Sequence, residues 1–159
     1  PASTRCRVSL TLTPSQADHG CLYGELCTPE GASAVRFVLR ADGKLYLRTT
    51  TEVPVGEYQS GEPLTITLEA DCTTFCCTLA LNGEPLRESD GSVKQFRFMR
   101  AANQISRLVL RTGPYLHTPT LDMDPEVLPE SILPSSDEPV QEVVYTIKQV
   151  EFAALSEKN

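Results

Sequence analysis

Arginine side chains recur in this sequence at positions that alternate with apolar residues. Successive side chains of a strand point to opposite faces, so these arginines would share the face away from the core. A guanidinium group binds a carboxylate through two parallel hydrogen bonds and stacks on flat surfaces. The pattern therefore predicts a surface that holds an acidic ligand, with Tyr46 on the same face and Tyr58 or Tyr115 as further rings. The arginines concerned are Arg36, Arg40, Arg48, Arg97 and Arg111.

A simpler interpretation of these arginines is that they pair with the chain's own acids or with a neighbouring domain. The chain has 159 residues, which suits one domain with a sizeable core, and its net charge is −7. Excess negative charge disfavours a nucleic-acid partner, and no apolar run approaches the roughly 20 residues of a membrane helix. The chain begins at Pro1 without a methionine and without a signal peptide's apolar core, which fits a mature form or a domain excised from a larger protein, and we favour the excised domain.

Three carboxylates lie close together in the string Asp122-Met-Asp124-Pro-Glu126. Retaining glycoside hydrolysis needs two carboxyl groups about 5 Å apart, which alternating positions on one strand can supply. Pro125 would interrupt a central strand, because it has no backbone N–H to donate to the ladder. We therefore expect a solvated acidic loop and no catalytic activity in this domain.

The same carboxylates form a weaker candidate for a calcium site, since Ca²⁺ accepts several oxygen ligands from a flexible loop. No glycine stands where a tight calcium loop would turn. Asp71 and Asp90 are comparable, weaker candidates. We expect no cofactor, with structural calcium left open.

Neither histidine belongs to a catalytic pattern. His19 and His117 both lie in polar stretches, and no Gly-x-Ser-x-Gly string is present. Both are therefore expected on the surface.

Six cysteines are present, an even number compatible with disulfides. Cys72 and Cys76 are separated by three residues, whereas zinc sites usually have two-residue gaps. Free thiols are favoured, and one disulfide between loops remains open. Cys76 and Cys77 should point to opposite faces of one strand. The remaining cysteines are Cys6, Cys21 and Cys27.

Period-two alternation is the dominant pattern and indicates strands that bury one face. Asp42-Gly43 and Asn82-Gly83 supply the residues that tight hairpin turns require. A phase shift near Lys148 suggests a β-bulge in the last strand. The stretch from Thr49 to Ser60 is expected to be a connection. The expected strands are 6–13, 21–27, 34–48 as a hairpin, 63–70, 76–82, 94–99, 105–111 and 142–153, with a long irregular loop at about 116–141.

Three strings in chain order carry a resemblance to a known family of domains. Val35 to Tyr46 contains Asp-Gly, Ile66 to Asp71 ends in an acid, and Leu79 to Gly83 ends in Asn-Gly. The set resembles concanavalin A-like or laminin-G-like jelly rolls, and Tyr145 to Phe152 is similar to their closing strand, with Lys148 where Asp is common. The resemblance implies an all-β, two-sheet antiparallel jelly-roll sandwich.

Domains of this kind often accompany carbohydrate-active enzymes, either as glycan-binding modules or as supports for a catalytic domain. The resemblance thus implies a non-catalytic accessory module whose partner is a polysaccharide or oligosaccharide, or an adjacent catalytic domain. With the arginines, it suggests an acidic glycan such as a uronic or sialic acid polymer. A secreted or cell-surface location is expected. The alternative is a structural or protein-interaction sandwich without a glycan ligand.

Overall fold

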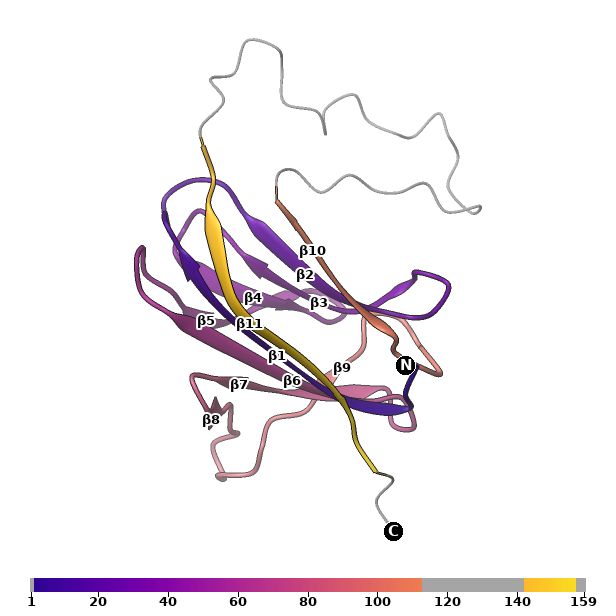
Figure 1. The fold of residues 1–159 in the computed structure, drawn as a ribbon. Coiled ribbons are helices and arrows are strands. Elements are labelled where there is room, and N and C mark those ends of the chain that lie inside the picture. The colour runs from indigo at the N-terminus through magenta and orange to yellow at the C-terminus, as the bar shows by residue number, and fades with distance from the viewer. Residues whose placement is uncertain (1, 113–141, 157–159) are drawn as a thin grey trace, which may run out of the picture.

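Two antiparallel β-sheets pack face to face in the computed structural model, which describes residues 2–112 and 142–156 (Figure 1). One sheet has the strand order β11-β1-β6-β7-β8, with β9 also pairing with β7, and the other has the order β10-β2-β3-β4-β5. Neither described range contains a helix, so none is available to span a membrane. The strands are β1 (Arg5–Pro14), β2 (Leu22–Cys27), β3 (Ser33–Leu39), β4 (Lys44–Arg48), β5 (Glu52–Glu57), β6 (Leu64–Asp71), β7 (Cys76–Leu81), β8 (Glu84–Pro85), β9 (Phe96–Arg97), β10 (Arg107–Thr112) and β11 (Tyr145–Ala154).

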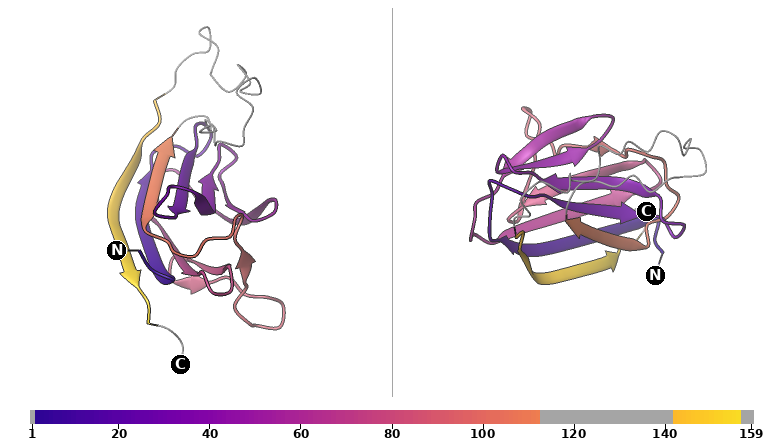
Figure 2. Two further views of the ribbon diagram at one scale, coloured as in Figure 1. Left: turned by 90° about the vertical axis from the view of Figure 1, so that its right-hand side faces the viewer. Right: turned by 90° about the horizontal axis from the view of Figure 1, so that it is seen from above.

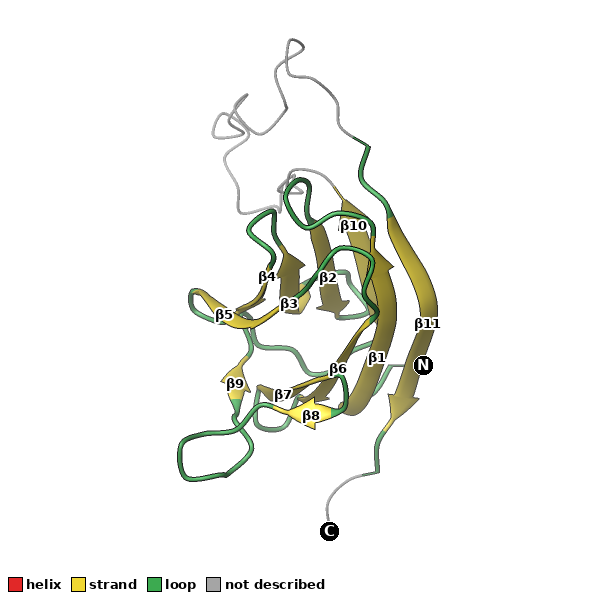
Figure 3. Cartoon of the chain, turned by 90° about the vertical axis from the view of Figure 1, so that its left-hand side faces the viewer, coloured by secondary structure: helices red, strands yellow, loops and turns green. Residues whose placement is uncertain are grey.

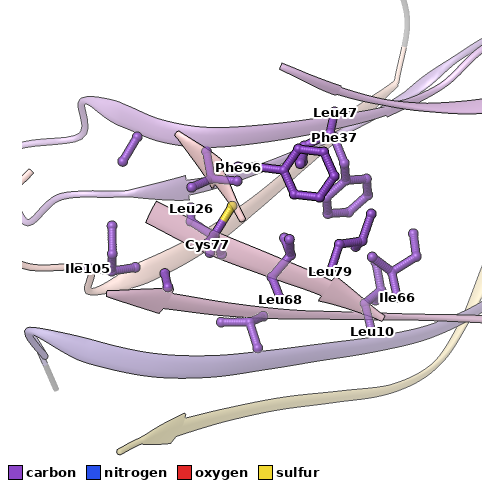
Figure 4. Close-up of a cluster of buried hydrophobic side chains, with 14 of the residues drawn as sticks. Leu10, Leu26, Phe37, Leu47, Ile66, Leu68, Cys77, Leu79, Phe96 and Ile105 are labelled. Atoms are coloured by element: carbon purple, nitrogen blue, oxygen red, sulfur yellow. The ribbon is translucent and has the colours of Figure 1, made fainter. Parts of the chain in front are cut away.

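The core lies between the sheets and is built from the alternating residues. In β6, every second side chain from Leu64 to Ala70 is buried, and β1 follows the same rhythm. Figure 4 shows Leu68 and Leu79 of one sheet pointing toward Phe37 of the other. Burying a side chain of this size contributes roughly 1.5–3 kcal/mol, so this layer holds the sheets together.

The first and last long strands lie side by side. β11 pairs with β1 along its length, from Tyr145 opposite Pro14 to Ala154 opposite Cys6, and follows the flank of the molecule (Figure 2). Gln149 pairs with Thr11 and Ile147 with Leu12, which leaves Lys148 as the extra residue. The β-bulge predicted near Lys148 is confirmed.

The predicted turns also form. Asn82 and Gly83 both have positive φ, 50° and 84°, and join β7 to β8 through a two-residue hairpin. Gly43, with φ of 74°, follows Asp42 between β3 and β4.

Two boundaries differ from the sequence-based expectation. Residues 52–57 form β5 rather than a connection, because an edge strand tolerates Pro54 where a central strand would not. The strand expected over 94–99 is reduced to Phe96–Arg97. The long loop expected at 116–141 lies outside the described residues.

Candidate functional site

The outward side of the five-stranded sheet carries most of the predicted arginines, and we call it the arginine face. Its residues follow from the strand register, in which Tyr23 pairs with Val38 and Glu25 with Arg36. Six basic side chains and three carboxylates share this face of an acidic protein. They are Arg36, Arg40, Lys44, Arg48, Arg107 and Arg111, with Glu25, Glu52 and Glu57.

Glu25 connects three strands of this face. Its side chain is only 4% exposed, and its Oε1 accepts a hydrogen bond from Nη2 of Arg111 on β10. Nε of Arg36, on β3, lies 3.7 Å from the same oxygen. A buried carboxylate is tolerated when it is paired with opposite charge. Arg36 and Arg111 therefore help to hold the sheet together from within.

Arg40 forms a second internal ion pair. Its Nη2 donates to Oε1 of Glu52 at 2.8 Å, and its Nε donates to Oε2 at 3.1 Å. The guanidinium carbon lies 5.7 Å from the ring centroid of Tyr46. The Tyr46 hydroxyl donates to Asp42 at 2.5 Å, which raises the pKa of Tyr46 and lowers the pKa of Asp42. Glu52 and Asp42 thus fix the positions of Arg40 and the Tyr46 ring.

Arg48 is the predicted arginine of this face that makes no hydrogen bond or ion pair with any residue in the described part of the chain. It is half-buried at the end of β4. Its neighbour on β3 is Arg36, a like charge, and its neighbour on β5 is Glu52, whose carboxylate is turned to Arg40. The Arg48 guanidinium would therefore be available to bind an acidic group from solution.

The structure brings five of the seven predicted site residues onto one face: Arg36, Arg40, Tyr46, Arg48 and Arg111. The expectation that Arg97 belongs with them is wrong, because β9 pairs with β7 in the other sheet and Arg97 lies opposite Cys76. Tyr115 lies outside the described residues.

Tyr58 differs from what the sequence suggested. Tyr58 is not a surface ring: it is 6% exposed and its hydroxyl donates to the Arg40 carbonyl at 2.5 Å. Tyr23 and Glu25 on β2 were not among the predicted site residues. Their alternation with Leu22 and Leu26 was the signal that could have placed them opposite the core.

Asp71 and Asp90, the other candidate calcium ligands, are hydrogen-bonded to neighbouring residues of the chain. The Asp71 carboxylate accepts from the backbone and hydroxyl of Thr73, and Asp90 bonds Ser92 in the same way. Over residues 2–112 and 142–156, no three His, Cys, Asp or Glu side chains gather as a metal site would require. The string from Asp122 to Glu126 lies outside those ranges, so calcium there stays a prediction.

All six cysteines are thiols in this structure. Cys77 is buried in the core, and burial raises its pKa to about 12, whereas Cys76 is half-buried on the opposite side of the strand. The expected opposite orientation of this pair is confirmed. His19 lies in a surface loop beside Asp18, as expected.

Sheets packed in this strand order define a jelly-roll sandwich, the class predicted from the sequence. Residues 1–126 match the family model described as Sialidase-like, CBM domain, where CBM denotes a carbohydrate-binding module. The chain belongs to this family. It is therefore an accessory module of the kind found in carbohydrate-active proteins. β11 lies beyond the matched residues and completes the six-stranded sheet.

Solved structures share this fold. A sialidase superposes with a TM-score of 0.77 at 21% identity, covering 97% of this chain and 14% of the sialidase chain. Sheep galectin-11, in complex with glycerol, has a TM-score of 0.53 at 11% identity over 95% of this chain and 91% of its own. A Trypanosoma rangeli sialidase mutant with trans-sialidase activity gives 0.53 at 15% identity, over 93% and 20%. A comparison with curated protein sequences found no match.

Proposed function

We propose that this module binds an acidic glycan on the arginine face, with Arg48 contacting a carboxylate of the sugar. The observation that carries the proposal is the half-buried Arg48 guanidinium without a partner in the described chain. Its neighbour Arg36 is held by Glu25, so Arg36 adds positive potential beside Arg48 without moving.

Tyr46 would contribute an apolar ring surface next to Arg48. The two residues share the outward side of β4, and the hydrogen bond to Asp42 fixes the ring from its hydroxyl end. Sugar rings pack on aromatic faces through their C–H groups, so a ring of fixed orientation favours one pose of the glycan. Arg40 covers part of the Tyr46 ring and limits the contact to what remains exposed.

The setting in a larger protein is also a proposal. The chain spans 14% of the sialidase chain and 20% of the Trypanosoma rangeli chain that share its fold. A module of this size would hold a glycan near a catalytic domain in the same polypeptide, or support that domain by packing. A secreted or cell-surface location fits glycan binding.

Affinity electrophoresis against acidic and neutral polysaccharides tests the proposed ligand class. We expect retardation by polymers rich in uronic or sialic acid and none by neutral glucans, with retardation reduced in Arg48→Ala. Arg7→Ala is the matched control, because Arg7 is an exposed strand arginine on the other sheet, paired with Glu69. Equal retardation of both variants would exclude Arg48 from the binding site, and no retardation by any glycan would favour the protein-interaction alternative.

A further inference from the structure

A pocket of about 260 Å³ opens at the edge of the sandwich, beside the end of β4 that carries Arg48. It lies between β5 of one sheet and the segment that contains β9 of the other, two strands that Figure 3 shows at the same edge of the molecule. The residues that matter below are Thr50, Pro54, Lys94, Gln95, Phe96 and Arg97.

The pocket is basic in an acidic protein. Lys94 and Arg97 both line it, and no carboxylate does. Neither side chain forms an ion pair with any residue of the described ranges, and the strand neighbour of Arg97 is the neutral Cys76. Two uncompensated cations at one opening favour an anion, because each charge adds to the local potential.

Polar and apolar groups stand beside the two cations. Thr50 and Gln95 offer a hydroxyl and an amide, neither of which is used in a hydrogen bond to the described residues. Pro54 supplies exposed apolar surface, while Phe96 belongs to the core, with its ring 5.4 Å from Nζ of Lys94. Such a combination suits a ligand with one anionic group, several hydroxyls and an apolar ring face.

We propose that this pocket is a second binding site, which takes a single carboxylate-bearing sugar ring. Its volume lies just below the range of roughly 300–1,000 Å³ for small-molecule pockets, so it fits one ring rather than an oligosaccharide. Lys94 and Arg97 contact the carboxylate, while Thr50 and Gln95 bond the sugar hydroxyls. Its four polar residues are not among the charged residues of the arginine face, although Pro54 lies opposite Tyr46, so variants of Arg48 and of Arg97 test the two sites separately.

Amide chemical-shift mapping with free glucuronic acid and free N-acetylneuraminic acid tests the second site, with glucose as the neutral control. We expect saturable shifts at Thr50, Gln95 and Phe96 with at least one of the acids and none with glucose. Loss of one charge-assisted hydrogen bond should weaken binding about tenfold in Arg97→Gln and further in a variant that also carries Lys94→Gln. Arg48→Ala should leave these shifts unchanged.

The second site would be overturned by the absence of saturable shifts with either acid, by undiminished affinity in Arg97→Gln, or by equal shifts with glucose. Because Arg97 is exposed, Arg97→Gln should fold normally and keeps the test decisive if the double variant does not fold. Shifts restricted to β4 would count against the pocket while supporting the arginine face. Inorganic phosphate binding as tightly as the sugar acids would show an anion site without sugar recognition and would also refute the proposal.

Discussion

Arg36 and Arg48 lie directly opposite each other on β3 and β4, two like charges in register on the same face of the sheet. Like charges at such positions destabilise a sheet by a few tenths of a kcal/mol to about 1 kcal/mol. Glu25 compensates Arg36, whereas Arg48 forms no ion pair with a described residue, because the Glu52 carboxylate opposite it is paired with Arg40. The repulsion between Arg36 and Arg48 slightly destabilises the ligand-free protein, and an anionic ligand would remove it.

Arg48→Ala is therefore expected to leave the free energy of unfolding unchanged or to raise it by up to about 0.5 kcal/mol. Urea unfolding of the ligand-free protein, followed by circular dichroism, measures this. A decrease of more than about 1 kcal/mol in the free energy of unfolding would mean that Arg48 has a structural partner and is not available to a ligand.

Glu25→Gln should destabilise the fold by about 3 kcal/mol, because removing a buried carboxylate leaves Arg36 and Arg111 without their shared counter-charge. Glu57→Gln is the control, since Glu57 is exposed and its replacement should change stability by less than about 0.5 kcal/mol. Similar unfolding midpoints in urea for the two variants would contradict the structural role given to Glu25.

Gly24→Ala should be strongly destabilising, because Gly24 lies opposite Phe37 and has no room for a side chain. A Cβ at Gly24 would stand 2.0 Å from Cζ of Phe37. Such overpacking typically costs about 1–3 kcal/mol. The double variant with Phe37→Leu should show a smaller penalty for the alanine than wild type does, measured by thermal unfolding in a double-mutant cycle. Additive effects would contradict the contact.

The two hydrogen bonds of the His19 ring, to the Asp18 carboxylate and the Glu142 carbonyl, should depend on pH. Its Nε2 donates to the Glu142 carbonyl at 3.0 Å while its Nδ1 faces Asp18 at 2.7 Å, so the charged ring satisfies both bonds. The Asp18 carboxylate, with the Glu142 carbonyl, raises the pKa of His19, and His19 lowers the pKa of Asp18. Both hydrogen bonds of the charged ring are therefore present below the ordinary histidine pKa of about 6.5. This stabilising pair is lost as pH rises through the higher pKa that His19 has in the folded protein.

NMR titration of the His19 ring should give a pKa above 6.5, and Asp18→Asn should bring it back toward that value. At low pH the hydrogen bond between His19 and Asp18 weakens again as Asp18 becomes protonated. His19→Gln assigns the resonance, since the chain has two histidines. A His19 pKa at or below the ordinary value would show that the bonds do not persist in solution.

Much of the fold followed from local pattern. Alternation along β1, β6 and β7 and the Asn82-Gly83 turn are properties of adjacent residues, and each was readable from the sequence. Pro54 was misleading because its tolerance depends on β5 being an edge strand, which is a property of the sheet order.

The site was predicted less completely, for the same reason. Alternation correctly put Arg36, Arg48 and Arg111 on outward faces but did not say which sheet each strand joins, so Arg97 was misplaced. The pairing of Glu25 with Arg111, which lie 86 positions apart, depends on β10 lying beside β2. No local signal contains that neighbour relationship.

Isothermal titration of an acidic oligosaccharide into wild type, Arg48→Lys, Arg48→Ala and Arg7→Ala tests the central claim most directly. A charge-assisted hydrogen bond contributes about 1.5–3 kcal/mol, so Arg48→Ala should lose at least about tenfold in affinity. Arg48→Lys should fall in between, because it keeps the charge and loses the bidentate geometry. Arg7→Ala should bind like wild type. Undiminished binding by Arg48→Ala would contradict the account.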